Sequence, residues 1–200
     1  MRHLDIKDPG FESVFEALCR RPSYPAEIET AVRDIIDRVR ADGDAALAAF
    51  AERFDHVQLT PAQFRVGADE IDAAAESLDS AAKKAIRAAL KHVQDFARQG
   101  RPKDWKYSPR SGVTLGEQFT PMERIGVYIP GGTAPLVSTV IHTAGIARAA
   151  GVKEIVAVTP PGRDGNVHPA VLYAMRVAGV TEIYRLGGVY FELQSTTSPG

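Results

Sequence analysis

The sequence predicts an α/β protein: an incomplete Rossmann-like parallel sheet with the order β-α-β-α-β, preceded by a mainly helical N-terminal region. Three short apolar runs in the last third of the chain predict the strands, since each is followed by glycine or proline. These runs start about 30 residues apart, which is the length of a βαβ unit. Amphipathic helical segments fill the two intervals, so each connection is expected to be a crossover to a parallel strand.

On this pattern the chain divides into four regions. They are an N-terminal arm at 1–25, a mainly helical region at 26–123, an incomplete Rossmann-like βαβ region at 124–190, and a polar tail at 191–200 that does not continue the pattern. In the arm, apolar residues at helical spacing between Phe11 and Leu18 predict a short helix. Cys19 is expected to be a small buried apolar group there. Because it is the only cysteine, an intrachain disulfide is excluded.

The helical region is expected to start with a helix from about Ala26 to Ala41. Gly43 ends it, and Asp44 is expected to cap a second helix that runs to about Phe54. The side chains expected to be buried on this second helix are Leu47, Phe50 and Phe54.

The rest of this region contains a predicted short strand, two helices and an extended segment. Phe64–Val66 is the predicted strand, and Asp69–Ser77 is the first helix. A long helix follows, which Asp79 or Ser80 caps and which ends at about Gln99, before Gly100. The residues expected to face inward on the long helix are Ile86, Leu90, Val93 and Phe96. Trp105 and Tyr107 are placed in a proline-bounded loop, before an extended segment at Val113–Phe119.

The Rossmann-like region alternates strands and helices. The expected strands are Ile125–Ile129, Lys153–Thr159 and Glu182–Leu186; the expected helices are Pro135–Ala150, closed by Gly151, and Pro169–Ala178, closed by Gly179.

The composition excludes several classes of protein. Of 200 residues, 44% are hydrophobic and 24% charged, which is typical of a globular domain. The net charge is −1, so the chain lacks the basic character of a nucleic-acid-binding protein. No apolar run approaches the roughly 18 residues that span a bilayer. Charged residues replace the apolar stretch of a signal peptide at the N-terminus, so we expect a cytoplasmic location.

The best candidate for a binding site is the turn after the first strand, Pro130-Gly131-Gly132. Ligands of open parallel sheets bind at the carboxyl ends of strands, and glycines let the backbone approach a ligand closely. Thr133 is a candidate cap for the following helix. A plain strand-to-helix turn would also need these glycines, and the G-x-G-x-x-G and Walker patterns are absent. Gly187-Gly188, which precedes Tyr190, can likewise be either a ligand-binding turn or a plain turn that needs glycine.

No catalytic or metal-binding set emerges from spacing. None of the five histidines has a partner two, three or four residues away that would form a metal pair on one element. We therefore assign no catalytic residue and no metal ligand to this chain.

Several separated motifs resemble the histidinol dehydrogenase family, in the family's order. The most specific is Tyr128-Ile129-Pro130-Gly131-Gly132, followed by a small residue and Ala-Pro-Leu. Further matches are the helical segment around Gly43 with Phe54-Asp55, the run Thr159-Pro160-Pro161-Gly162, and Leu186-Gly187-Gly188. The resemblance covers roughly residues 26–188.

The resemblance implies an NAD-dependent, two-step oxidation of histidinol to histidine, with a zinc ion that positions the substrate and a Glu-His pair. It also implies a homodimer for a full-length member. Tyr128 and Pro130 match positions that line the NAD site, and Phe54 is a further candidate. Tyr190 stands where the family has a glutamine that contacts NAD.

The family's zinc ligands and Glu-His pair match no residue of this chain, and residues 191–200 match no family motif. We therefore expect a shortened member that is inactive alone. Two alternatives stay open. One is a related NAD-dependent dehydrogenase acting on another small polyol. The other is a non-catalytic binding or interaction module that keeps the fold.

Overall fold

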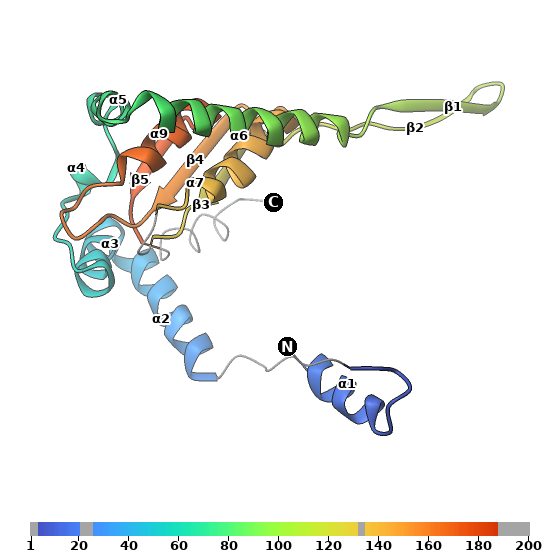
Figure 1. Cartoon of the computed structure of the whole chain (residues 1–200), viewed down its shortest axis with the longest axis horizontal. Coiled ribbons are helices and arrows are strands. Elements are labelled where there is room, and N and C mark those ends of the chain that lie inside the picture. The colour runs from blue at the N-terminus through green and yellow to red at the C-terminus, as the bar shows by residue number, and fades with distance from the viewer. Residues whose placement is uncertain (1–3, 21–25, 132–134, 188–200) are drawn as a thin grey trace.

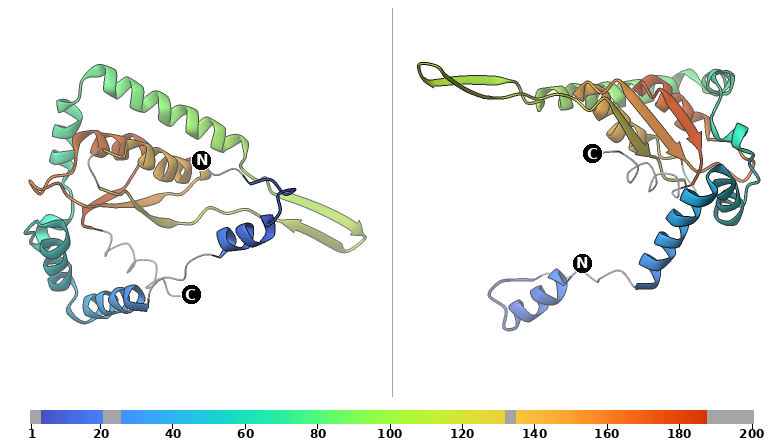
Figure 2. Two further views of the ribbon diagram at one scale, coloured as in Figure 1. Left: turned by 60° about the horizontal axis from the view of Figure 1, so that its bottom comes forward. Right: turned by 180° about the vertical axis from the view of Figure 1, so that it is seen from behind.

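A parallel sheet of three strands lies at the centre of the computed structural model, which describes residues 4–20, 26–131 and 135–187. The strands β3 (Arg124–Tyr128), β4 (Glu154–Thr159) and β5 (Glu182–Arg185) lie in the order β3–β4–β5 and run parallel (Figures 1 and 2). Val127 pairs with Ala157, and Ala157 pairs with Ile183, so the three carboxyl ends meet at one edge. The predicted fold class is confirmed.

The main hydrophobic core lies between one face of this sheet and a layer of helices. Alternate strand residues point to this face, so Ile155, Ala157 and Ile183 are buried in it. The layer consists of α5 (Ala68–Ser77), α6 (Ser80–Gln99), α9 (Pro169–Ala178) and the first crossover helix (Figure 1). Leu172 and Met175 of α9 are almost fully buried there.

The first crossover helix contains a π turn. It runs as α7 (Val137–Val140), η2 (Ile141–Gly145) and α8 (Ile146–Ala150), and so starts two residues after the expected Pro135. A Cβ on Gly145 would lie 2.8 Å from Leu90 Cδ1, so the glycine permits close packing on α6. Gly151 and Gly179 adopt the left-handed conformation after α8 and α9 and stop these helices as predicted.

A second, smaller core lies on the opposite face of the sheet, near its carboxyl edge. Helix α2 (Ala26–Asp42) leads to α3 (Asp44–Phe50), and Leu47 and Phe50 pack with Val158 and Leu186. Gly43, not Asp44, is the N-cap residue of α3, and its φ of 56° requires glycine.

The second helix ends differently from the expectation. It continues as the π turn η1 (Ala51–Asp55), and Phe54 is 47% exposed rather than buried. The wider π turn changes the direction in which each residue points, so the interval of four residues from Phe50 no longer selects the buried face. Phe54 instead stacks on Phe50 at 5.7 Å between ring centroids.

The predicted strand at Phe64–Val66 is wrong. Pro61–Phe64 is the single helical turn α4, because Thr60 and Gln63 form a capping box. An isolated bridge, from Arg65 to Tyr184, connects this segment to β5, and the Val66 N–H donates to the Ile183 carbonyl at 2.9 Å.

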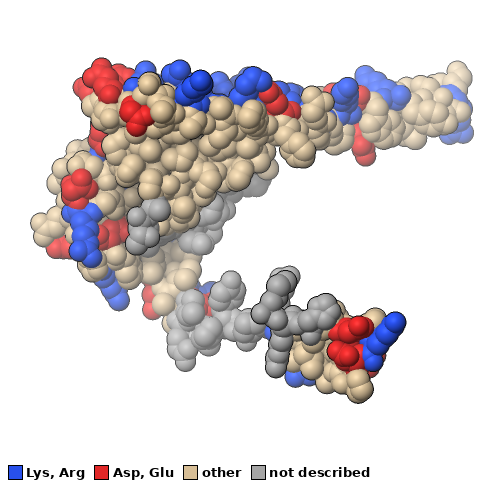
Figure 3. Space-filling view, viewed as in Figure 1, with Lys and Arg blue, Asp and Glu red and all other residues tan. Residues whose placement is uncertain are grey.

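Asp79 caps α6 as predicted, with its carboxylate accepting from the Ala82 N–H at 2.7 Å. Phe96, expected to face inward, is 84% exposed, because the last turns of α6 extend beyond the sheet (Figure 1). Basic side chains follow the outward side of α6 (Figure 3).

Trp105 and Tyr107 lie in a strand rather than a loop. Strands β1 (Trp105–Arg110) and β2 (Val113–Glu117) form an antiparallel hairpin that projects beyond α6 (Figure 1). The Trp105 Nε1–H donates to Glu117 across the hairpin at 2.8 Å. Cross-strand pairing, which single-segment periodicity does not reveal, therefore fixes this segment.

The N-terminal helix α1 (Phe11–Cys19) forms as expected but contains no buried residue. Cys19 is exposed, contrary to its expected burial. None of the helices in the described ranges is both long and apolar enough to cross a membrane.

Candidate functional site

Two turns meet at the carboxyl edge of the sheet. The first follows β3 and contains Pro130 and Gly131; the second follows β4 and contains Pro160 and Pro161. A Cβ on Gly131 would lie 2.5 Å from Pro160 Cγ, a distance that real Cβ atoms do not reach. Gly131 therefore permits the close contact between the two turns.

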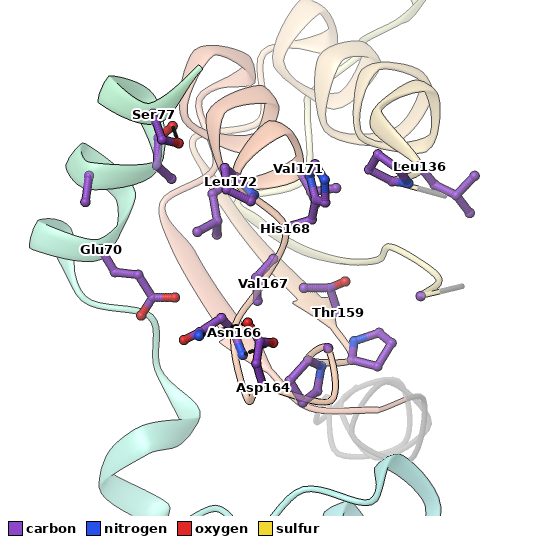
Figure 4. Close-up of a pocket in the computed structure, with 18 of the residues that line it drawn as sticks. Glu70, Ser77, Leu136, Thr159, Asp164, Asn166, Val167, His168, Val171 and Leu172 are labelled. Carbon is purple, nitrogen blue, oxygen red and sulfur yellow. Dashed lines mark hydrogen bonds between the residues drawn. The ribbon is translucent and has the colours of Figure 1, made fainter. Parts of the chain in front are cut away.

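A cavity of about 560 Å³ opens beside these turns (Figure 4). Its walls come from the Pro130–Gly131 turn, the 159–168 loop, and the facing sides of α5 and α9. Its size and its mixture of apolar walls with a few polar groups are typical of small-molecule sites. The polar side chains that line it are Glu70, Ser77, Thr159, Asp164, Asn166 and His168.

Short-range hydrogen bonds shape the loop side of the cavity. Asp164 accepts from the side-chain amide of Asn166 at 3.1 Å and from its backbone N–H at 3.1 Å. These bonds favour the charged carboxylate and hold the pKa of Asp164 below its ordinary value, with the side-chain bond the larger cause. His168 caps α9, since its Nδ1 accepts from the Ala170 N–H at 3.1 Å.

An ion pair joins α5 to the end of β5 behind this loop. Arg185, only 9% exposed, donates to Glu70 and to the carbonyl oxygen of Gly165, the latter at 3.2 Å. Glu70 Oε1 and Arg185 Nε are buried without a protein hydrogen-bond partner. The pair therefore ties one wall of the cavity to the sheet.

A second group of side chains lies on the other face of the same edge. Tyr128 is half-buried against the smaller core, and Asp55, at the end of η1, lies beside it. Burial raises the pKa of Asp55, while the Gly187 N–H and His56 oppose this change. Burial, and secondarily the charge of Asp55, raise the pKa of Tyr128, so this residue stays a neutral phenol at physiological pH.

The residues predicted for the site thus fall on two sides of one edge. Pro130 and Gly131 line the cavity, whereas Tyr128 and Phe54 lie at the smaller core on the opposite face. Gly132 and Tyr190 lie outside the described residues, as does Thr133, the expected cap.

Sequence reasoning missed five polar residues of this region. They are Asp55, Glu70, Asp164, Asn166 and His168. One sequence signal was available for His168, because it directly precedes a proline at a predicted helix start, as an N-cap residue does. Glu70 had no such signal, since its partner is 115 residues away. Asp55 belongs to the matched Phe54-Asp55 motif, but its partner Gly187 is 132 residues away and its role had no local signal.

The groups at this edge are partly exposed rings, a glycine-lined backbone and single polar side chains. Such a mixture suits an aromatic, hydroxyl-rich ligand. Among the described residues, no group of three or more His, Cys, Asp or Glu side chains could hold a metal.

Comparison with known proteins gives a consistent result. The family model "Histidinol dehydrogenase" matches residues 19–190. The chain is 42% identical over 189 residues to histidinol dehydrogenase of Caulobacter vibrioides, covering 94% of this chain and 44% of that protein. It is 44% identical over 163 residues to the Thermosynechococcus vestitus enzyme, covering 82% and 38%. The chain therefore spans less than half the length of these curated relatives.

A solved structure extends the similarity to the fold. The crystal structure of histidinol dehydrogenase from Elizabethkingia anophelis superposes with a TM-score of 0.79 at 34% identity, covering 88% of this chain and 41% of that one.

Proposed function

Because this chain belongs to the histidinol dehydrogenase family, we propose that it forms the coenzyme-binding part of an NAD-dependent alcohol oxidoreductase. The proposed parent activity is the oxidation of histidinol to histidine in two steps. NAD, when bound, accepts the hydride in each step.

One observation carries this proposal: the Pro130–Gly131 turn follows the parallel strand β3 and opens directly onto a cavity. In doubly wound sheets, ligands bind outside the carboxyl ends of the strands, where the loops diverge. A turn that faced away from any cavity, or antiparallel neighbours of β3, would have removed this support.

The residues of the edge have distinct proposed roles. The ring of Pro130 offers an apolar surface. Gly131 has no side chain, so a ligand can approach the backbone closely there. Tyr128 and Phe54 offer aromatic surfaces on the other face. We keep Gly132 and Tyr190 as proposed coenzyme contacts on the strength of their motif positions.

We also propose that the chain does not oxidise histidinol by itself. With histidinol, NAD and zinc supplied, the purified chain is expected to form no NADH, because the resemblance assigns it no acid-base pair. Absorbance of NADH checks this, with an active family member as the positive control. Sustained NADH formation would refute this part of the proposal. Assembly of a full-length member as a homodimer stays a prediction.

Substitution of Gly131 tests coenzyme binding directly. Gly131→Ala is expected to weaken NAD binding at least about tenfold, or roughly 1.4 kcal/mol, because the new methyl group displaces the Pro130 turn from Pro160. Isothermal titration calorimetry of the 200-residue chain measures the affinity.

Gly67→Ala is the matched control, since a Cβ there meets nothing within 4 Å and φ is ordinary at −75°. Equal NAD affinities of Gly131→Ala and Gly67→Ala would contradict the proposed role of the turn. No binding by the parent chain would favour the interaction-module alternative.

A further inference from the structure

The side chain of Asp55 makes an unusually close approach to the end of β5. Its carboxylate oxygens lie 2.6 and 2.8 Å from the position that a Cβ on Gly187 would occupy. A Cβ at position 187 would force the carboxylate to move, and the Gly187 N–H donates to the carboxylate. Asp55 thereby holds the backbone where β5 leaves the sheet.

The same carboxylate also acts on the end of β3, since its charge adds to the effect of burial in raising the pKa of Tyr128. This group of residues lies on the face opposite the cavity.

The local backbone that carries Asp55 is irregular in two respects. Asp55 is the last residue of the π turn η1, and π turns within helices occur frequently at functional sites. His56, which follows it, has a φ of 58°, the sole positive φ of a non-glycine residue in the described ranges. Such conformations persist when surrounding structure imposes them, and they are concentrated at ligand sites.

Burial of the Asp55 carboxylate costs stability at neutral pH, and the Gly187 N–H offsets only part of this cost. Because the pKa of Asp55 is raised on folding, the folded chain binds more protons than the unfolded chain between the two pKa values. The contribution of Asp55 to stability therefore falls as pH rises through this window and stays unfavourable above it. His56 and Tyr128 are the titratable groups that face Asp55.

We propose that Asp55 is a positioning residue at the carboxyl edge of the sheet, which holds the Gly187 backbone in place for the dinucleotide. This inference rests on the proposed NAD site and adds to it a residue that does not itself touch the cavity.

Two substitutions separate positioning from simple stability. Asp55→Ala removes the acceptor and is expected to weaken NAD binding about tenfold and to expose the Gly187 amide to hydrogen exchange, with global stability near that of the parent. Asp55→Asn keeps an acceptor oxygen, so binding within about threefold of the parent and continued protection of Gly187 are expected. It is also expected to be more stable than the parent at neutral pH, because no buried charge remains.

Glu52→Gln is the matched control, since Glu52 is an exposed acid of the same π turn. Calorimetry gives the NAD affinity, NMR the exchange of Gly187, and urea unfolding the stability. If Asp55→Ala binds NAD like Glu52→Gln while the parent chain binds, the inference is overturned and the proposed function stands. If Gly187 exchange is unchanged in Asp55→Ala, the inference is likewise overturned. If the parent chain does not bind NAD, the proposed function fails, and the positioning role fails with it.

Discussion

Arg185→Leu is expected to lower the free energy of unfolding by about 2–3 kcal/mol. Leucine would leave the Glu70 carboxylate without its counter-ion and the Gly165 carbonyl without a donor. Removing one partner of a fully buried pair costs about 3–5 kcal/mol. The loss expected here is smaller, because 31% of the Glu70 side chain is exposed. Urea unfolding of the parent and variant chains measures the difference.

Two further variants test whether the lost ion pair causes this fall in stability. Arg33→Ala removes an ion pair whose side chains are both 71% exposed, and it is expected to change stability by less than about 0.5 kcal/mol. The double variant Arg185→Leu with Glu70→Leu is expected to recover most of the loss, because no charge is left buried alone. A single variant as stable as Arg33→Ala would show that the pair contributes nothing.

This ion pair also illustrates what the sequence cannot reveal. Glu70 and Arg185 are 115 residues apart, and each alone is compatible with a solvated surface position. Asp55 and Gly187 present the same problem. The Pro130–Gly131 turn, by contrast, was predictable, because a buried strand followed by proline and glycine is a local pattern and its edge of the sheet follows from parallel topology.

Local chemistry likewise explains the elements that were predicted well. The three strands, helix α9, the Asp79 cap and the stops at Gly151 and Gly179 each depend on residues a few positions apart. Phe54 and Phe96 were misplaced for tertiary reasons: a π turn rotates the first, and the second lies on a part of α6 that the sheet does not reach.

The hairpin had a signal that flanking prolines concealed. Alternating large side chains at Trp105 and Tyr107 precede a turn at Ser111-Gly112, where Gly112 has a φ of 78°, and Val113 and Leu115 alternate after it. Proline at 109 favoured a loop, but an exposed hairpin tolerates proline at an edge.

The division of the chain at residue 124 needs a physical interpretation. Helices α5 and α6 precede it in sequence, yet Ile86 and Leu90 of α6 belong to the same core as Ile155 and Leu172. We therefore propose that residue 124 marks the start of the sheet rather than a boundary between independent folding units. Residues 68–99 and 124–187 would then share one folding transition.

Ile129→Ala tests whether the stability of the sheet is coupled to NAD binding at the Pro130–Gly131 turn. Ile129, which separates Tyr128 from Pro130 in the sequence, is completely buried in the main core. Its N–H donates to the Val158 carbonyl at 2.8 Å. Truncation is expected to lower the free energy of unfolding by roughly 2–4 kcal/mol, through lost burial and the cavity left behind. Ile146→Ala, at a side chain 43% exposed, is the control, with an expected change below about 0.5 kcal/mol.

A graded series keeps this test informative if the alanine variant unfolds. Ile129→Val is expected to cost about 0.5–1.5 kcal/mol and to leave the backbone in place, so NAD affinity should change little while stability falls. That result would separate two roles: the core supports the edge, and the Pro130–Gly131 turn shapes it. Gly131→Ala, by contrast, is expected to weaken NAD binding. If Ile129→Val weakened NAD binding as much as Gly131→Ala, the turn would owe its geometry to core packing and not to the contact between Gly131 and Pro160.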